Sequence, residues 1–237
     1  MGRRENPIDR TVPARAGLAD FLRARRQLAE LTYRQMAAHS GAVSAATLER
    51  AASGTVVPAW DTVEEFILAT VSEKDFFLEG IMDHGRRLWI RARRATRAPY
   101  YVHAAPDPTL LATAADFLRA LRQQHVWAGY PTPGEMERTS GPGELPTTTV
   151  RRIIAGEALP VDPQQAIAFL KACYVVTATD LEQWLAAAVR GLQDVPARSR
   201  NLAKWVQAHQ RLAEQAQTDA VAEVRRLPAP LEEKQAA

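Results

Sequence analysis

Apolar side chains in this sequence recur at intervals of three and four residues, and an alternation of period two is rare. Intervals of three and four place side chains along one face of an α-helix, whereas period two is typical of a strand. One predicted helical stripe consists of Leu18, Phe21, Leu22, Leu28 and Ala29, and another of Leu110, Leu111, Ala114, Phe117, Leu118 and Leu121. We therefore predict an all-α fold with at most incidental strand.

Two segments of the sequence occur twice. Asp-Phe-Leu-Arg-Ala at 20–24 returns at 116–120, and the segment 47–54 aligns with 149–156, each with a proline four residues after its final glycine. The second pair of segments keeps its Thr, Arg and Gly at the same spacing. Two matches in the same order and at nearly the same separation indicate an internal duplication.

Proline and glycine mark the boundaries between the predicted domains. Residues 98–108 contain three prolines and predict a linker, and the Gly- and Pro-rich residues 129–146 predict a loop inserted in the second copy. The expected organisation is a first domain at 1–98, a second and divergent domain at 107–196, and a C-terminal helix and tail at 197–237.

Residues 31–54 carry the start and stop signals of two short helices. Thr32 and Ser44 are residue types that accept hydrogen bonds from the first turn of a helix, and Gly41 and Gly54 suit the left-handed backbone that ends one. Ala37 is small enough to let two helices cross closely. This order is typical of a helix-turn-helix, whose second helix lies in the major groove of DNA.

Residues 18–71 resemble the lambda-repressor-like helix-turn-helix family, also called the xenobiotic response element family. The matching residues are Phe21, Leu22, Arg25, Leu31, Thr32, Met36, Ala37, Gly41, Val43, Ser44, Thr47, Leu48, Arg50, Gly54 and Pro58, after which Trp60 to Val63 open a fourth helix. The resemblance implies a compact five-helix DNA-binding domain, and two such units in tandem if the second copy counts. The chain departs from the family pattern at Tyr33, where Gln is usual, at Ala42, which lengthens the turn by one residue, and at Ala45 and Ala46 in the recognition helix.

Both copies supply candidate DNA-binding residues. In the first copy they are Tyr33, Arg34, Ser44, Ala45, Ala46, Thr47 and Arg50, and in the second Thr147, Thr148, Thr149, Arg151 and Arg152. The two alanines can touch a thymine methyl group but cannot hydrogen-bond a base edge, whereas Thr and Arg can bond bases or phosphates. Base-specific recognition is therefore less well supported in the first copy than contact with phosphates.

The second copy has an unusual residue at the predicted helix crossing. The simplest alignment places Glu137 opposite Ala37, and a carboxylate buried at a close crossing is costly. Either the alignment slips in the loop, or this helix does not pack as a standard hairpin. The second copy is thus either a DNA-binding unit or a degenerate copy kept for packing or self-association.

Arginine clusters near the end of a helix predicted over residues 73–97. The cluster consists of Arg86, Arg87, Arg91, Arg93, Arg94 and Arg97. It suits a stripe that contacts phosphates, or cations that stabilise a helix C-terminus. We favour the second interpretation, because six arginines over three turns cannot all face one way.

Residues 197–226 predict one long helix with a heptad-like seam. The seam consists of Leu202, Val206, His209, Ala213, Ala216 and Ala220, with Trp205 and Leu212 beside it. Steps of four and three suit pairing with a second copy in a homodimer or docking along the chain's own second domain. Both alternatives stay open on sequence alone.

Catalytic and metal-binding patterns are missing from the sequence. The single cysteine, Cys173, stands in an apolar run and predicts a packed core thiol, and the five histidines are too scattered for metal ligation. We expect no enzymatic activity and no cofactor. The start of the chain leads into no apolar signal-peptide segment, and no apolar stretch approaches the ~20 residues that span a bilayer, so we expect a cytoplasmic protein without membrane contact.

These patterns together predict a bacterial DNA-binding transcriptional regulator that acts on double-stranded DNA, as a homodimer or through its tandem units. Two alternatives remain. One is an architectural or plasmid- or phage-replication-associated DNA-binding protein, and the other is a protein-interaction module built on degenerate helix-turn-helix units. The net charge of only +3 does not decide between them.

Overall fold

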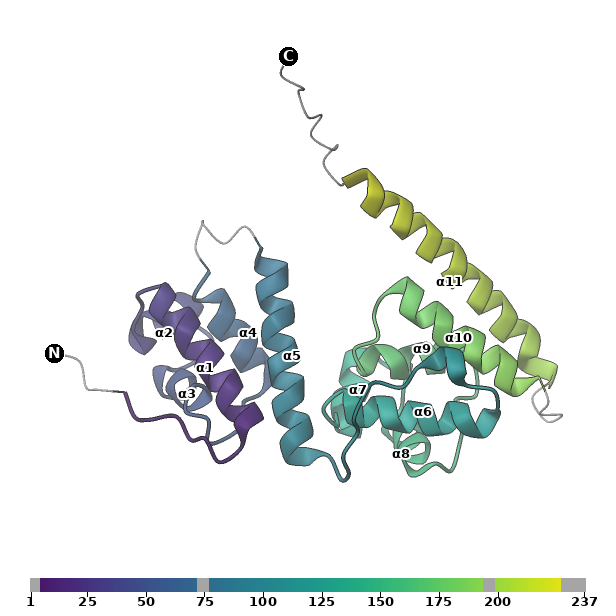
Figure 1. The fold of residues 1–237 in the computed structure, drawn as a ribbon, viewed down its shortest axis with the longest axis horizontal. Helices are drawn as coiled ribbons and strands as arrows, with labels where there is room; N and C mark the ends of the chain where they lie inside the picture. The colour runs from purple at the N-terminus through teal and green to yellow at the C-terminus, as the bar shows by residue number, and fades with distance from the viewer. Residues whose placement is uncertain (1–4, 72–76, 194–198, 227–237) are drawn as a thin grey trace, which may run out of the picture. The chain divides into compact units, whose positions relative to one another are not determined.

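The computed structural model describes residues 5–71, 77–193 and 199–226, and in these residues all regular structure is helical (Figure 1). The all-α fold predicted from the sequence is therefore confirmed. Contacts divide the chain into two compact units, one formed by residues 1–102 with 126–130 and the other by 103–125 with 131–237. None of the described helices is long and apolar enough to cross a membrane.

The first unit holds five helices around one core. In chain order they are α1 (Pro13–Leu28), α2 (Tyr33–Ser40), α3 (Ala45–Ala51), α4 (Trp60–Leu68) and α5 (Leu78–Arg97). Leu22, Met36, Leu48 and Phe66 are fully buried at the centre. Because these side chains come from α1, α2, α3 and α4, one core fixes the short helices α2 and α3 against the longer ones.

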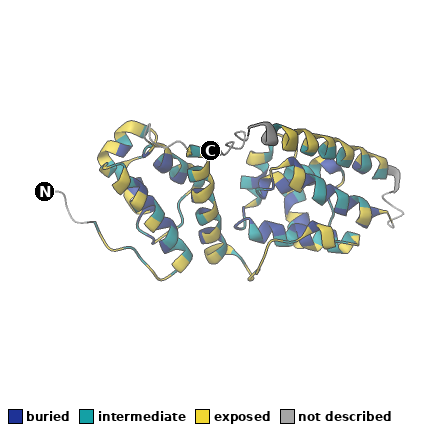
Figure 2. Ribbon diagram, turned by 45° about the horizontal axis from the view of Figure 1, so that its top comes forward, coloured by how far each residue is buried: buried dark blue, intermediate teal, exposed yellow. Residues whose placement is uncertain are grey.

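The second unit is built from six α-helices and a short 3-10 turn. They are η1 (Pro108–Leu110), α6 (Ala114–Trp127), α7 (Pro133–Ser140), α8 (Thr147–Ala155), α9 (Pro163–Ala172), α10 (Ala178–Leu192) and α11 (Ser199–Arg226); the last two residues of α6 count with the first unit. Phe117 lies edge-on to Trp184 and Trp205, with ring centroids 6.1 and 6.4 Å apart. Both units contain buried residues, and Figure 2 colours them dark blue along the helices of each unit.

The prediction of a loop over residues 129–146 was wrong, because α7 lies inside this range. Thr132 caps α7, since its hydroxyl accepts from the Glu135 backbone N–H at 3.2 Å while the Glu135 carboxylate accepts from the Thr132 N–H at 2.7 Å. Pro133 occupies the first turn, where proline favours a helix because its missing N–H would have no partner there. Only the Gly- and Pro-rich residues 141–146 form the turn between α7 and α8.

Two apolar positions assigned to helix stripes are exposed instead. Leu28 and Leu110 have 73% and 78% of their surface exposed. Leu28 is the last residue of α1, and Leu110 lies in η1 ahead of α6. Both lie at or beyond the end of the predicted helix, so the helix does not place them on the core face.

The repeated pentapeptide does not occupy equivalent places in the two units. Asp20 lies in the middle of α1 and forms an exposed ion pair with Arg10. Asp116 lies in the first turn of α6, where its carboxylate accepts from the Thr113 backbone N–H at 3.1 Å. The hydrogen bonds of Thr113 lower the pKa of Asp116. The repeated pentapeptide therefore lies inside a helix in the first unit and in the capped first turn of a helix in the second unit.

One side-chain hydrogen bond in each unit joins comparable positions of the matched segments. Arg23 Nε donates to the Ala52 carbonyl at 2.8 Å, and Arg122 Nε donates to the Ile154 carbonyl at 2.8 Å. Ala52 and Ile154 hold the same place in the matched segments 47–54 and 149–156. An alignment of α1 and α6 on these two bonds differs from the pentapeptide match by three residues.

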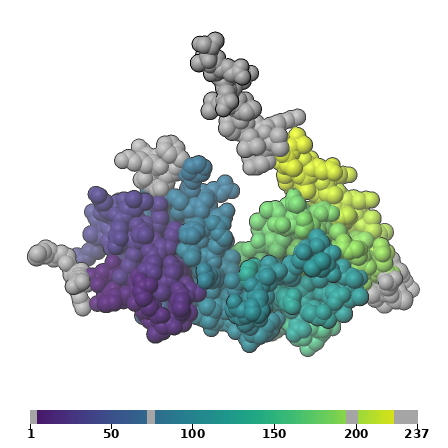
Figure 3. Space-filling view, in the orientation of Figure 1, coloured from purple at the N-terminus to yellow at the C-terminus, as the bar shows by residue number. Residues whose placement is uncertain are grey.

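The first part of α11 packs against its own unit. Trp205 is almost fully buried, and His209 is paired with Glu182 of α10. Side chains at residues 217–222 of α11 are mostly exposed, and Figure 3 shows the yellow part of this helix continuing past the body of its unit. The interpretation of docking within the chain therefore describes the first half of α11, and Trp205, placed beside the seam in the sequence, is its central contact.

Cys173 lies in the second unit with 1% of its surface exposed, as predicted for a core thiol. Its carbonyl accepts a hydrogen bond from Gln124 Nε2 at 3.1 Å. Burial raises the pKa of the thiol above its ordinary value. The reactive thiolate is therefore disfavoured while the unit is folded.

Candidate nucleic-acid interface

The helix pair α2–α3 has the caps and the turn predicted from the sequence. Thr32 and Gln35 form a capping box at the start of α2, and Ser44 Oγ accepts from the Thr47 backbone N–H at 3.2 Å at the start of α3. Gly41 ends α2 with φ 65°, a left-handed conformation that glycine adopts without strain. Four residues, 41–44, therefore separate two firmly capped helices, which is the geometry of a helix-turn-helix.

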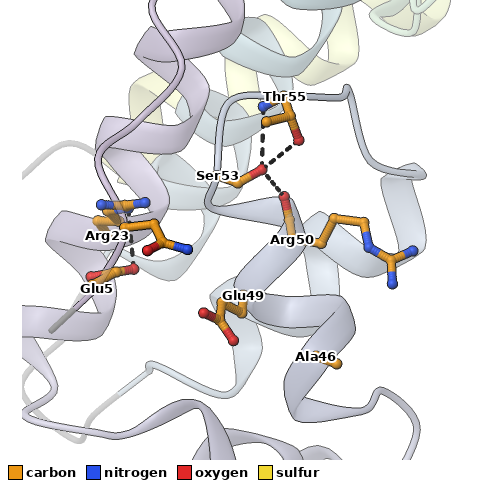
Figure 4. A pocket seen from close by; sticks show the side chains of 8 residues that line it. Glu5, Arg23, Ala46, Glu49, Arg50, Ser53 and Thr55 are labelled. Atoms are coloured by element: carbon orange, nitrogen blue, oxygen red, sulfur yellow. Dashed lines mark hydrogen bonds and ion pairs between the residues drawn. The ribbon is translucent and has the colours of Figure 1, made fainter. Parts of the chain in front are cut away.

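The solvent face of α3 is formed by Ala46, Glu49 and Arg50 (Figure 4). Of the predicted residues on this helix, Ser44 is exposed, while Ala45 and Thr47 are half-buried and the Thr47 hydroxyl lies 2.9 Å from Ser44 Oγ. Glu49 was missed in the sequence analysis, although its spacing of three from Ala46 places both on one helix face. A carboxylate here can accept a hydrogen bond from a cytosine amino group, but it repels phosphate.

Tyr33 and Arg34 begin α2 and differ in accessibility. Arg34 is exposed, whereas Tyr33 is half-buried, with its ring edge-on to Phe66 at 6.2 Å and beneath the guanidinium of Arg26 at 4.9 Å. The Tyr33 hydroxyl donates to the carboxylate of Glu5. Burial is the main cause that raises the pKa of Tyr33, and the hydrogen bond to the negative Glu5 carboxylate raises it further. The phenol therefore stays protonated and remains a hydrogen-bond donor.

Glu5 joins three basic or donating side chains at the edge of this surface. Its carboxylate lies 3.1 Å from Arg23 Nε and 3.0 Å from Arg26 Nη2, in addition to the contact with Tyr33. The N-terminal segment is held nearby, because the Asp9 backbone N–H donates to the Ser53 carbonyl at 2.9 Å. This cluster could not be predicted from the sequence, because nothing in the local pattern pairs residue 5 with α1 and α2.

The arginines of α5 do not form one stripe, as expected for six arginines spread over three turns. Arg93 is buried and its Nε donates to the Gly129 carbonyl at 3.2 Å within the first unit. Arg86 stacks over the Trp60 ring at 3.7 Å. The exposed members are Arg87, Arg91 and Arg97. Part of this cluster is thus structural rather than available to a phosphate backbone.

In the second unit, α8 exposes a more basic face than α3 does. Thr148, Arg151 and Arg152 are exposed, and Thr147 and Thr149 are half-buried. Val150 and Ile153 are buried on the opposite side of the helix. The exposed group combines a hydroxyl with two guanidinium groups, which can bond base edges and phosphates.

Glu137 belongs to α7, and its side chain reaches the first turn of α8. It is half-buried, and its carboxylate accepts from the Thr147 backbone N–H at 3.4 Å. The turn over residues 141–146 is longer than its counterpart at 41–44, so α8 begins beside Glu137. A negative charge at a helix N-terminus is favourable, and the expected cost of a buried carboxylate does not arise.

Comparison with known proteins agrees with the local geometry. Residues 18–69 match the family model of a helix-turn-helix domain, a range that contains α2, α3 and α4. The search found no similar protein among curated proteins and none among solved structures. The match thus assigns a helix-turn-helix to the first unit and names no more specific function.

Proposed function

We propose that this protein is a DNA-binding transcriptional regulator that places its helix-turn-helix elements in the major groove. The observation that carries the proposal is the capped pair α2–α3, which lies within the residues that match a helix-turn-helix model. In such pairs the second helix enters the groove and the first crosses the sugar–phosphate backbone. The proposal includes no catalytic activity and no cofactor.

The exposed residues of α2 and α3 suit backbone contact better than base recognition. Arg34 and Arg50 are exposed at the ends of the two helices and can donate to phosphate oxygens. Ala46 offers a methyl group that fits a thymine methyl, which is a weak and partial code. We therefore assign the first unit chiefly to positioning the protein on the duplex.

We assign base recognition to α8 of the second unit. Thr148 and Arg151 can reach base edges from the first turns of the helix, and Arg152 can donate to guanine or to phosphate. In this proposal the second unit is a divergent copy of the first, and the protein binds as a homodimer or through both units of one chain. The corresponding hydrogen bonds of Arg23 and Arg122 support the divergent-copy part of the proposal.

Binding to a pool of random duplex DNA at two salt concentrations tests the proposal. A regulator retains DNA, enriches a motif and loses affinity steeply with salt, because counterion release sets the slope and base contacts set the motif. Replacing Arg50 and Arg152 together by Ala should lower both the affinity and the salt slope. An unchanged affinity and slope in this variant would contradict the proposed docking.

A protein-interaction module is the second candidate, and the surface of α3 favours it. Ala46 and Glu49 form a face that is small and acidic where a DNA reader is usually polar or basic. Failure to retain any DNA at low salt would support this candidate. Retention without an enriched motif would instead support an architectural DNA-binding protein.

A further inference from the structure

The cluster around Glu5 has the composition of an anion-binding site. Two donors, Arg26 Nη2 and the Tyr33 hydroxyl, converge on the two oxygens of one carboxylate, and the cation of Arg23 forms an ion pair with it, with Nε 3.1 Å from the nearer oxygen. The side chains of Arg23 and Arg26 are only 14% and 19% exposed. Two largely buried cations share one carboxylate, so Arg23, Arg26 and Glu5 by themselves carry one more positive than negative charge.

The donors are fixed by the folded unit and not by Glu5. Arg23 Nε donates its single hydrogen to the Ala52 carbonyl at 2.8 Å, and Arg26 Nη1 donates to the Leu31 carbonyl at 3.0 Å. The Tyr33 ring packs against Phe66 and carries the Arg26 guanidinium on its face. Removal of Glu5 would therefore leave a preformed site, because Arg23, Arg26 and Tyr33 each have a contact inside the unit that does not involve Glu5.

The position of the site relates it to the proposed DNA surface. Tyr33 is the first residue of α2, and a hollow connects the cluster to the exposed face of α3; it is lined by Glu5, Arg23, Ala46, Glu49 and Arg50, so one carboxylate besides Glu5 lies beside it (Figure 4). Two oxygens of a phosphodiester can take the places of the two carboxylate oxygens, since guanidinium groups bind both kinds of anion in the same way. A DNA strand that passes α3 would bring such a phosphate.

We propose that Arg23, Arg26 and Tyr33 form a phosphate-binding site that Glu5 fills in the free protein, and that a backbone phosphate of DNA replaces the Glu5 carboxylate on binding. The source of the phosphate rests on the proposed function, whereas the site itself does not. Glu5 is then an internal competitor that weakens binding to every sequence alike. A purely structural Glu5, which only pins the N-terminal segment, predicts no such competition.

The first experiment measures the affinity of the full chain for random duplex DNA at low salt. Glu5→Ala should bind about tenfold more tightly than the wild type, because a charge-assisted contact no longer has to be exchanged. Asp20→Ala is the matched control, since it removes one carboxylate and one exposed ion pair from the same unit. Its affinity should change far less. Equal changes in the two variants would overturn the competition by Glu5.

The second experiment needs no DNA and follows thermal unfolding at constant ionic strength as inorganic phosphate is added. Glu5→Ala and the shape-conserving Glu5→Gln should gain thermal stability with phosphate, whereas the wild type and Asp20→Ala should not. The gain should disappear when Tyr33→Phe and Arg26→Ala are added to Glu5→Ala. Cooperative unfolding without a phosphate response in both Glu5 variants would overturn the site.

The two experiments separate the site from the proposed function. A phosphate response together with tighter DNA binding supports the whole inference. A phosphate response in variants that do not bind DNA at any salt supports the site and overturns DNA as its ligand, and with it the proposed function. DNA binding by the wild type, with neither response in the Glu5 variants, overturns the inference and leaves the proposed function intact.

Discussion

In the first unit α3 turns Ala46, Glu49 and Arg50 to the solvent, whereas in the second α8 turns Thr148, Arg151 and Arg152 outward. One face carries a carboxylate and a single guanidinium group, and the other carries two guanidinium groups and a hydroxyl. The buried sides of the two helices differ much less, since Leu48 on α3 and Val150 on α8 are both fully buried. The core constrains one side of such a helix, while the exposed side is free to change its chemistry.

The preceding helices, α2 and α7, are also alike in their buried residues and caps and differ in the charged residues around them. Met36 and Met136 are both fully buried, and Thr32 and Thr132 both form capping boxes. The acidic residues near these helices differ, because Glu5 binds the side chains of α1 and α2, whereas Glu137 caps the backbone of α8. Similar caps and buried residues therefore say little about which of the two surfaces contacts a ligand.

The largest expected effect distinguishes the two exposed faces. Arg151→Ala combined with Arg152→Ala should weaken binding to the enriched DNA motif by about 100-fold, because each arginine contributes to base or phosphate contact. Arg50→Ala should cost only about fivefold, since α3 offers one such group. Fluorescence anisotropy at fixed salt measures both affinities. A larger loss from Arg50→Ala would reverse the assignment of base recognition to α8.

The second largest expected effect is on stability and concerns the glycines that follow α3 and α8. Gly54 and Gly156 have φ angles of 76° and 83°, so alanine is strained at both positions. A Cβ on Gly54 would lie 2.6 Å from the backbone oxygen of Asp9, whereas one on Gly156 would lie 3.1 Å from the movable end of Arg122. Gly54→Ala should therefore cost about 3 kcal/mol and Gly156→Ala about 1 kcal/mol. Urea denaturation of each variant, compared with the wild type, measures the difference, and equal losses would contradict the role of Asp9.

A smaller effect tests the different roles of the repeated pentapeptide. Thr113→Ala removes the cap of α6 and should lower the Tm of the second unit by about 3 °C at neutral pH. Hydrogen bonds from Thr113 hold the pKa of Asp116 below its ordinary value, so this contribution is present above the ordinary carboxyl pKa and is lost as pH falls through the lowered one. The gap in Tm between variant and wild type should therefore narrow in strong acid. A gap that stays constant down to that range would show that the carboxylate takes no part in the cap.

The smallest expected signal comes from the single cysteine. Cys173 is buried in the second unit, and burial raises the pKa of its thiol, so a thiol reagent at pH 8 should label the folded protein only through opening of that unit. Gly156→Ala should increase the labelling rate, whereas Gly54→Ala, in the other unit, should leave it near that of the wild type. Rapid labelling of the native wild type would contradict the buried placement. An equal acceleration by both substitutions would show that the units open together.

Local patterns predicted the caps, the turn glycines and the order of helices in the first unit because these depend on neighbouring residues. Thr32, Ser44 and Gly41 each act within four residues of their own position. The same kind of reasoning failed at α7, where Pro133 was taken as a helix breaker although it occupies the first turn. Proline has opposite effects at the start and in the interior of a helix, and only the position of the cap distinguishes them.

The repeated pentapeptide predicted that its residues occupy equivalent positions in the two units, and the structure places them differently. Asp20 and Asp116 match in sequence, yet one lies in the middle of a helix and the other in the first turn. The hydrogen bonds of Arg23 and Arg122 support a different alignment of α1 with α6, three residues away from the pentapeptide match. A short match cannot fix such a register, because a helix repeats its faces every three or four residues.

Sequence alone determined the helical class of this protein and the helix pair α2–α3, since periodicity and caps are local properties of the chain. The tertiary structure decided which side chains of that pair remain available. Glu5 reaches Arg23, Arg26 and Tyr33 only because the N-terminal segment folds back along the first unit. Charges separated by many residues attract one another over a few ångströms, so their pairing depends on distances that no local pattern contains.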